Sequence, residues 1–436
     1  MMTSSFWLSA VIAPKGVIQV PRARASKAHQ KNRQRPMLSA QMSLTAALLL
    51  AFSLPGRAAG LPALIRDAVT GDPAILEARA NEEAAASRGQ AARAQRYPTF
   101  GVQAGEYVAN PGDYGKPFRG IVSRVNLYSA GAVDASIERE AERAQSSRFR
   151  TAEARESVAA NVAALFLEAL RAEELLQAER VNLTRHQRIV DDLQVIVEND
   201  KGRRYEWVQA SSRALQVRMR IVQYEKAMKL ALSKLTRYTQ QVPTLSDPIN
   251  DRWREAVSEP LARLPHPAVE AQRREALAVR ADQKAMSRQR WPRVDLEAGM
   301  GNSGYARIVL NWSFFDRSAD YTVQAAAQQI VAAEKRAELL EREFDQRSAT
   351  AQADMAQSQL LIKAAEAQIG ASASVVELYE LQFKVGRRSL IELVNAYAEL
   401  AAVEASRINA ANDYRQAVIG YLFANARLAD WAAAQP

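Results

Sequence analysis

Residues 98–128, PTFGVQAGEYVANPGDYGKPFRGIVSRVNLY, decide the fold of this chain because the hydrophobic period changes there from that of a helix to that of a strand. Apolar and polar residues alternate on both sides of a turn-rich centre at 110–115, which predicts a β-hairpin. A second hairpin is predicted at 292–314. Pro98 and Pro292, which precede the two hairpins, lie 194 residues apart. We therefore interpret the chain as an internal duplication.

Long helices are predicted after both hairpins. The runs 129–199 and 317–384 contain no proline and little glycine, and the first would be on the order of 105 Å long at about 1.5 Å per residue. A globular core needs no helix of that length. Each run reaches a glycine, Gly202 or Gly386, where we expect the chain to turn and return as a second helix. The predicted fold class is therefore mainly α with a small β part.

The chain divides into four predicted segments. Residues 1–60 are a basic leader with a secretory signal peptide, 61–240 the first repeat, 241–265 a proline-rich linker and 266–436 the second repeat. The signal is inferred from basic residues followed by an apolar run at 44–54 and then small residues. That run is shorter than the roughly 20 residues of a membrane-spanning helix. Met37 or Met42 is an alternative start of the leader.

Composition excludes several functions. Residues 1–60 hold eight Lys or Arg and no acidic residue, so only +2 of the formal charge of +10 belongs to the rest of the chain, and we expect no nucleic acid partner. The absence of cysteine excludes disulfides, thiolate metal sites and an N-terminal lipid on cysteine. No metalloprotease, phosphate-loop or serine-hydrolase motif occurs, and His186 and His266 are expected to be solvated or helix-capping. We expect no enzyme, no cofactor and no metal site.

The strands are predicted to carry one apolar and one polar face. The residues expected to face lipid are Phe100, Val102, Val125, Leu127, Val294, Leu296, Ile308, Leu310 and Trp312. Arg293, Asp295, Glu297 and Arg307 alternate with them and suit a watery lumen. Such strands in an exported chain favour an outer-membrane barrel, which four strands cannot close, so several chains would have to contribute. The alternative, a soluble four-stranded sheet that caps a helical bundle, stays open.

Three features occur in an order that resembles one known family. They are the strand-to-helix junction VNLYSAG at 125–131, the paired prolines before the hairpins, and the tip segments at 202–210 and 383–396. Over about residues 61–431 the chain resembles the TolC-like outer-membrane efflux and secretion channels, and it is similar to their non-lipidated branch. The resemblance implies a homotrimer with a twelve-stranded barrel in the outer-membrane lipid of a Gram-negative bacterium. A periplasmic α-barrel would then meet an adaptor protein and, through it, an inner-membrane transporter.

The resemblance also implies functional residues at the two tips. Glu392 matches the first of two acidic positions that line the pore constriction, and Asn395 stands where the second is usually Asp. Glu206, Arg388 and Phe383 match a latch that holds the closed gate. The repeated Gly-Arg-Arg motifs are expected to contact the adaptor, and their residues are Gly202, Arg203, Arg204, Gly386 and Arg387.

The predicted function is a passive exit duct of a tripartite efflux pump or of a type I secretion system. The rival hypothesis is a periplasmic adaptor or a structural coiled-coil protein, because adaptors also use long helical hairpins. Adaptors carry one hairpin flanked by Gly-rich β-domains, whereas this chain has two hairpins and little β sequence. A lumen built for drugs or other small molecules and one built for polypeptides would have the same strand period and strand count. The sequence therefore leaves all three classes of cargo open.

Overall fold

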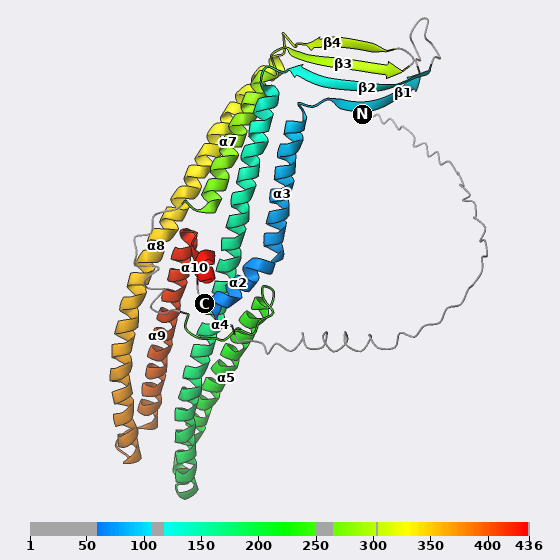
Figure 1. Cartoon of the computed structure of the whole chain (residues 1–436). Helices are drawn as coiled ribbons and strands as arrows, with labels where there is room; N and C mark the ends of the chain where they lie inside the picture. The colour runs from blue at the N-terminus through cyan, green and yellow to red at the C-terminus, as the bar shows by residue number, and fades with distance from the viewer. Residues whose placement is uncertain (1–58, 107–116, 249–264, 302–303, 435–436) are drawn as a thin grey trace, which may run out of the picture. The chain divides into compact units, whose positions relative to one another are not determined.

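Strands from both halves of the chain form one antiparallel sheet (Figure 1). The computed structural model describes residues 59–106, 117–248, 265–301 and 304–434. The strands are β1 (Thr99–Glu106), β2 (Pro117–Tyr128), β3 (Arg293–Gly301) and β4 (Tyr305–Asn311), and they lie in the order β1-β2-β3-β4. The predicted leader up to residue 58, the turn at 110–115 and most of the linker lie outside the described residues.

Pairing of β2 with β3 joins the two predicted hairpins. Val125 pairs with Leu296 in this antiparallel ladder. The two strands come very close at Gly301, where an added Cβ would stand 2.1 Å from the carbonyl oxygen of Arg119. Only glycine fits such a close backbone approach. The hairpins therefore form one continuous sheet, with β1 and β4 as its edges.

The two halves contain helices in the same order, and the predicted long helices are confirmed. Helices α3 (Pro73–Ala94) and α7 (Pro267–Arg288) precede the strands with 22 residues each, and α4 (Ala132–Asn199) and α8 (Arg317–Lys384) follow them with 68 residues each. The returning helices are α5 (Arg204–Leu235) and α9 (Leu390–Ala424). The short elements are α2 (Leu61–Gly71), η1 (Lys201–Arg203) and α10 (Leu428–Ala434). Figure 1 shows α4 beside α5 and α8 beside α9. Among the described helices, none combines the length and the apolar character needed to cross a membrane.

Helix α4 begins three residues later than the proline-free run suggests. Ala130 and Gly131 have positive φ angles of 53° and 83°. A right-handed helix cannot contain that conformation. The chain therefore makes a sharp turn between β2 and α4 before the helix starts at Ala132.

Equivalent side chains cap α3 and α7. Asp72 Oδ1 accepts the N–H of Ala74 at 2.8 Å, and His266 Nδ1 accepts the N–H of Ala268 at 3.1 Å. A proline follows each cap at the first helical position, where a missing N–H costs no hydrogen bond. Of the two roles expected of His266, a solvated or a helix-capping side chain, the structure shows the capping one.

The larger apolar cluster lies around the middle of α4. Side chains from α2, α4, α9 and α10 bury one another there, and Figure 1 shows α2 and α10 beside α4. Its fully buried members include Leu64, Ile65, Phe166, Leu167 and Leu428. Full burial of one such side chain stabilises the fold by about 1.5–3 kcal/mol, so the cluster holds the C-terminal helix against α4.

A buried arginine fastens the segment that ends at residue 248 to the helices. Arg415 on α9 donates to the two carboxylate oxygens of Glu174 on α4 at 2.9 and 2.8 Å. It also donates to Asp247 at 2.8 Å. A buried guanidinium requires such carboxylate partners, so the three side chains form one structural unit.

Candidate functional site

The first tip is a tight turn between α4 and α5. Asp200 Oδ1 accepts the N–H of Gly202 at 2.9 Å, and the single turn η1 links the two helices. Arg203 then donates to Glu206 Oε2 through two nitrogens at 3.1 and 2.5 Å. Glu206, predicted as a latch residue, is therefore held by an arginine of its own tip.

The second tip depends on a left-handed glycine. Gly386 has a φ of 71°, and nothing lies within 4 Å of a Cβ built there, so the backbone conformation selects glycine rather than lack of space. Its N–H donates to the carbonyl of Phe383 at 3.0 Å. Gly202 has no positive φ. The backbone conformation of the turn therefore requires glycine only at Gly386, while a Cβ at Gly202 would meet the Asp200 side chain at 3.1 Å from Oδ1.

A capping box begins α9 and contains the predicted constriction residue. Ser389 Oγ accepts the N–H of Glu392 at 3.4 Å, and Glu392 Oε2 accepts the N–H and the hydroxyl of Ser389 at 3.1 and 2.8 Å. Arg388 donates to Glu392 Oε1. The hydrogen bonds from Ser389, followed by that from Arg388, lower the pKa of Glu392 to about 2. The carboxylate is ionised at neutral pH but has a cation beside it. Asn395 is exposed one turn further along α9.

Arg388 is engaged within the second tip. Besides Glu392, its guanidinium binds Gln382 Oε1 at 3.0 Å and lies 4.1 Å from the centroid of the Tyr379 ring. Glu206 is not among its partners within one chain. The latch was predicted as a contact between the two hairpins, but within one chain Glu206 and Arg388 each bind a partner in their own tip. The latch therefore stays a prediction.

Each Gly-Arg-Arg tip uses its two arginines differently. Arg203 and Arg388 bind carboxylates of their own tip. Arg204 and Arg387 are exposed and form no ion pair with any described residue. One arginine of each Gly-Arg-Arg motif is therefore available to an external partner.

The two helical hairpins contact each other at the tips through apolar side chains. Phe383 of α8 is buried in a cluster that joins Ile189 of α4 with Leu390 of α9. The Arg203 guanidinium lies 6.0 Å from the centroid of the Phe383 ring, at the limit of a cation–π contact. Of the three predicted latch residues, Phe383 is the one that belongs to both hairpins' shared core.

The two described histidines are buried and neutral at pH 7. His186 on α4 is 4% exposed and lies edge-on to Tyr397, so the expectation of a solvated or capping side chain is wrong for this residue. His266 stacks on Phe344 with 3.8 Å between ring centroids. Burial lowers the pKa of both imidazoles to about 4, far from the neutral range that suits a general base. The described residues contain no group of three or more side chains that could hold a metal ion.

The apolar face of the sheet is exposed, and on its charged face two carboxylates are buried among arginines that are themselves exposed. The register puts one set of apolar side chains on the same face: Phe100, Val102, Val125, Val294, Leu296, Ile308 and Leu310. Leu127 flanks the register shift at 126–128, and Trp312 follows β4. Val102 is 81% exposed, whereas Asp295 and Glu297 on the opposite face are 5% and 9% exposed. This is the reverse of a sheet that packs its apolar face in a core.

Ion pairs run across the charged face of the sheet. Glu297 accepts from Arg124 of β2 at 2.7 Å and from Arg307 of β4 at 2.9 Å. Asp295 accepts from Arg293 at 2.9 Å. Carboxylates and guanidinium groups thus alternate over three strands and satisfy one another without an apolar core.

Apolar side chains are also exposed on the long-hairpin helices. One group of them follows heptad spacing on α5, and another lies in the half of α8 nearest the tip. They are Val208, Leu215, Met219 and Val222 on α5 and Leu360, Leu361, Val375, Leu378 and Leu381 on α8. A seam at this spacing is buried when a second helix packs on it. Within the described chain, no helix covers these residues.

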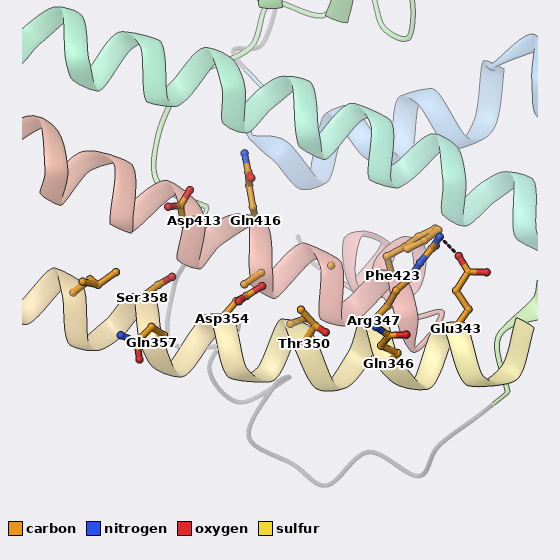
Figure 2. Close-up of a pocket in the computed structure, with 14 residues that line it drawn as sticks. Glu343, Gln346, Arg347, Thr350, Asp354, Gln357, Ser358, Asp413, Gln416 and Phe423 are labelled. Carbon is orange, nitrogen blue, oxygen red and sulfur yellow. Dashed lines mark hydrogen bonds and ion pairs between the residues drawn. The ribbon is translucent and has the colours of Figure 1, made fainter.

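A polar groove of about 860 Å³ lies between α8 and α9 (Figure 2). Figure 2 shows Asp354 and Ser358 of α8 across from Asp413 of α9, and an ion pair between Arg347 and Glu343 at 2.5 Å. Binding pockets for small organic ligands are mostly apolar, with few polar groups. Most residues that line the groove are polar or charged, so we do not assign it as a ligand pocket.

Comparison with known proteins finds a family match over part of the chain and a similar fold in several outer-membrane channels. Residues 64–240 match the family model described as outer membrane efflux protein. The fold is similar to that of the outer-membrane channel OprN, with a TM-score of 0.73, 16% identity, and coverage of 84% of this chain and 89% of that one. It is also similar to VceC of Vibrio cholerae, with a TM-score of 0.72, 15% identity, and coverage of 84% of this chain and 96% of that one. The open state of MtrE of Neisseria gonorrhoeae is similar too, with a TM-score of 0.71, 17% identity, and coverage of 84% of this chain and 88% of that one. By sequence, no curated protein matches the chain.

Proposed function

Because the chain is TolC-like in fold and matches the outer membrane efflux protein family over residues 64–240, we propose that it is the outer-membrane exit duct of a tripartite efflux pump. In this role it is a passive conduit and not an enzyme. An inner-membrane transporter supplies the energy, a periplasmic adaptor joins the two, and this chain carries the cargo out of the cell. An efflux pump is favoured over type I secretion because the matched family is one of efflux proteins.

The observation that carries the proposal is the exposed apolar face of the sheet. Phe100, Val102 and Ile308 are 75%, 81% and 70% exposed, and at about 25 cal/mol per Å² such surface is costly to leave in water. In a lipid bilayer the same side chains would contact hydrocarbon, while the ion-paired face would line a watery lumen. A soluble sheet that caps a helical bundle would need the opposite arrangement.

A homotrimer follows from the edges of the sheet. β1 and β4 leave unpaired backbone groups, which lipid does not satisfy. Three copies, each with four strands, close a twelve-stranded barrel in which β4 of one copy pairs with β1 of the next. The same symmetry lets the exposed apolar residues of α5 and α8 pack between copies and continue the barrel as a helical tube.

We assign the segments accordingly. Residues 1–60 are the basic leader and signal for export, and 61–240 and 266–436 are the two repeats of each protomer, joined by a linker at 241–265. The sheet lies in the outer membrane of a Gram-negative bacterium, and the helices extend into the periplasm. A rival role as a periplasmic adaptor does not account for a second hairpin or for an apolar sheet face in contact with solvent.

The tips are the proposed contact with the adaptor. Gly202 and Gly386 mark the two turns, and Arg204 and Arg387 are the exposed cations beside them. A partner helical hairpin with acidic side chains near its own turn would complement them.

The constriction is proposed at the start of α9. Threefold repetition would bring three copies of Glu392 around the axis, with Asn395 one turn above, as a ring that attracts cations. Because Arg388 is paired with Glu392, the ring attracts cations fully only when that arginine turns to another carboxylate, such as Glu206 of the next copy. Glu206, Arg388 and Phe383 remain our proposed latch.

The two faces of β4 test the proposal directly. The chain has no cysteine, so single substitutions Ile308→Cys and Val309→Cys introduce unique labelling sites on adjacent residues of opposite faces. An environment-sensitive fluorophore is attached to each, and the protein is reconstituted in lipid vesicles. We expect lipid-borne nitroxides to quench the label at 308 and aqueous iodide to quench the label at 309. Iodide quenching of both labels to the same extent would contradict the proposal.

A further inference from the structure

A cavity of about 910 Å³ lies where α7 enters β3 and where β4 leaves for α8. Its lining includes Trp291, Trp312 and Phe314, which are 61%, 58% and 84% exposed. Trp312 and Phe314 meet edge to face, with 6.3 Å between ring centroids. They continue the alternation of the apolar face of β4 beyond the end of that strand. The cavity thus opens at the border between the apolar sheet face and the helices.

Two opposite charges in this cavity have no ion-pair partner among the described residues of one chain. Arg290 pairs with Asp320 at 2.7 Å and is occupied. Arg288, at the end of α7, is exposed and forms no ion pair with a described residue. Asp316 accepts the N–H groups of Ser318 and Ala319 through Oδ1 at 2.9 and 3.2 Å, and no described residue donates to its Oδ2. The cavity therefore offers one guanidinium and one carboxylate oxygen beside aromatic rings.

We propose that this cavity binds the head group of phosphatidylethanolamine. The phosphate accepts hydrogen bonds from Arg288, the ammonium group donates to Asp316, and the acyl chains lie along the apolar face that begins at Trp312. Tryptophan suits this depth because its ring is apolar while its N–H donates to head-group oxygens. The inference rests on the proposed outer-membrane location, and it adds a specific lipid and the residues that select it.

The first half of the chain lacks this combination at its equivalent position. With the offset of 194 residues that relates Pro98 to Pro292, Ala94 stands in place of Arg288 and Tyr97 in place of Trp291. The structural ion pair is kept, since Arg96 pairs with Asp134 as Arg290 pairs with Asp320. The second half therefore carries Arg288 in addition to the arginine–aspartate ion pair that both halves share. We infer one head-group site per protomer.

Native mass spectrometry of the full-length exported protein in detergent tests the proposal. Phosphatidylethanolamine and phosphatidylglycerol are titrated separately, and free phosphoethanolamine serves as a competitor. Arg288→Ala inserts the residue that the first half uses, and Asp316→Asn keeps a good helix cap while it removes the charge. Arg93→Ala, which removes an exposed cation from the end of α3, is the matched control.

We expect wild-type protein to bind phosphatidylethanolamine more tightly than phosphatidylglycerol. Loss of one exposed ion pair predicts an affinity about two- to fivefold lower for Arg288→Ala with both lipids. Asp316→Asn should abolish the preference between the lipids, and Arg93→Ala should change neither. Equal affinity of the wild type for the two lipids, or equal losses in Arg288→Ala and Arg93→Ala, would overturn the proposal. Displacement of the lipid by an equal concentration of free phosphoethanolamine would also overturn it, because the site would then take the soluble head group without any contribution from acyl chains. Channel conductance of the same preparation tests the proposed function separately.

Discussion

At the scale of single residues, the tips are governed by arginines that have more than one possible partner. Arg388 binds Glu392 and Gln382 and covers the Tyr379 ring, while Arg203 binds Glu206. Ion pairs near water are weak, since side-chain ordering and solvation offset most of their attraction. A neighbouring copy that presents a second carboxylate can therefore exchange these partners at little cost, which is what a gate requires.

The double variant Arg388→Ser with Glu206→Ala should raise single-channel conductance in a planar bilayer. The double substitution removes the carboxylate and the guanidinium that the proposed latch uses. In a trimer three such latches are lost, and three small contributions to the stability of the closed state add up to a substantial shift of the opening equilibrium. The control is Arg342→Ser with Glu338→Ala, an exposed pair on α8 of the same chemistry. Unaltered conductance in the first variant would remove the latch.

Glu156 gives the fold a pH dependence. This carboxyl is 5% exposed and accepts the N–H groups of Leu428 and Ala429 at 3.1 and 3.2 Å, and burial raises its pKa to about 7. Because the folded value lies above the unfolded value of about 4.3, the folded state binds the proton more tightly, and this contribution to stability is lost as pH rises from about 4.3 to 7.

Thermal unfolding at pH 5 and pH 8 checks that dependence. We expect Glu156→Gln to show a smaller fall in melting temperature between the two pH values than the wild type, since glutamine still accepts a hydrogen bond from the start of α10 but does not ionise. Glu198→Gln, at an exposed site on the same helix, should behave like the wild type. A wild-type melting temperature that rises from pH 5 to pH 8, with Glu156→Gln unchanged, would contradict the assignment.

At the scale of elements, the helices and strands could be predicted from the sequence because each has a local cause. Proline-free runs and the change of hydrophobic period mark α4, α8 and the four strands, and the Ser389-x-x-Glu392 spacing is a capping-box signal. Partner choice has no such cause. Nothing in the sequence pairs Arg388 with Gln382 and Tyr379 rather than with Glu206, and the burial of His186 depends on Tyr397, which is more than 200 residues away.

The two tip glycines should respond differently to alanine. Gly386→Ala places a Cβ in the left-handed region and should lower the free energy of unfolding by about 1–2 kcal/mol. Gly202→Ala should cost less, because its φ is ordinary and the added Cβ meets only the Asp200 side chain, at 3.1 Å from Oδ1. Denaturant unfolding of the detergent-solubilised protein measures both. Equal losses of unfolding free energy in the two variants would contradict the difference between the two turns.

Bulky replacements at the same glycines test the contact with the adaptor. Gly202→Leu and Gly386→Leu each place a large side chain on the surface proposed to meet the partner hairpin, so both should abolish efflux in cells. The mass of each complex should remain that of the wild type, because the tips lie outside the sheet edges that close the barrel. Undiminished efflux with either leucine would refute the contact at that tip.

At the scale of the whole molecule, a single chain is incomplete in two independent ways. The sheet has two unpaired edges and an exposed apolar face, and α5 and α8 carry apolar residues that no described helix covers. One assembly resolves both, because a rotation that pairs β4 with the β1 of another copy also brings helices of adjacent copies together. We propose three copies because four strands from each give the twelve strands that leave room for an aqueous lumen.

The mass of the detergent-solubilised complex tests this account most directly. Measured by native mass spectrometry after export and removal of detergent in the gas phase, it should equal three times the mass of one mature chain, with no change on dilution. A complex of one chain, inserted in micelles and stable on its own, would contradict the trimeric duct.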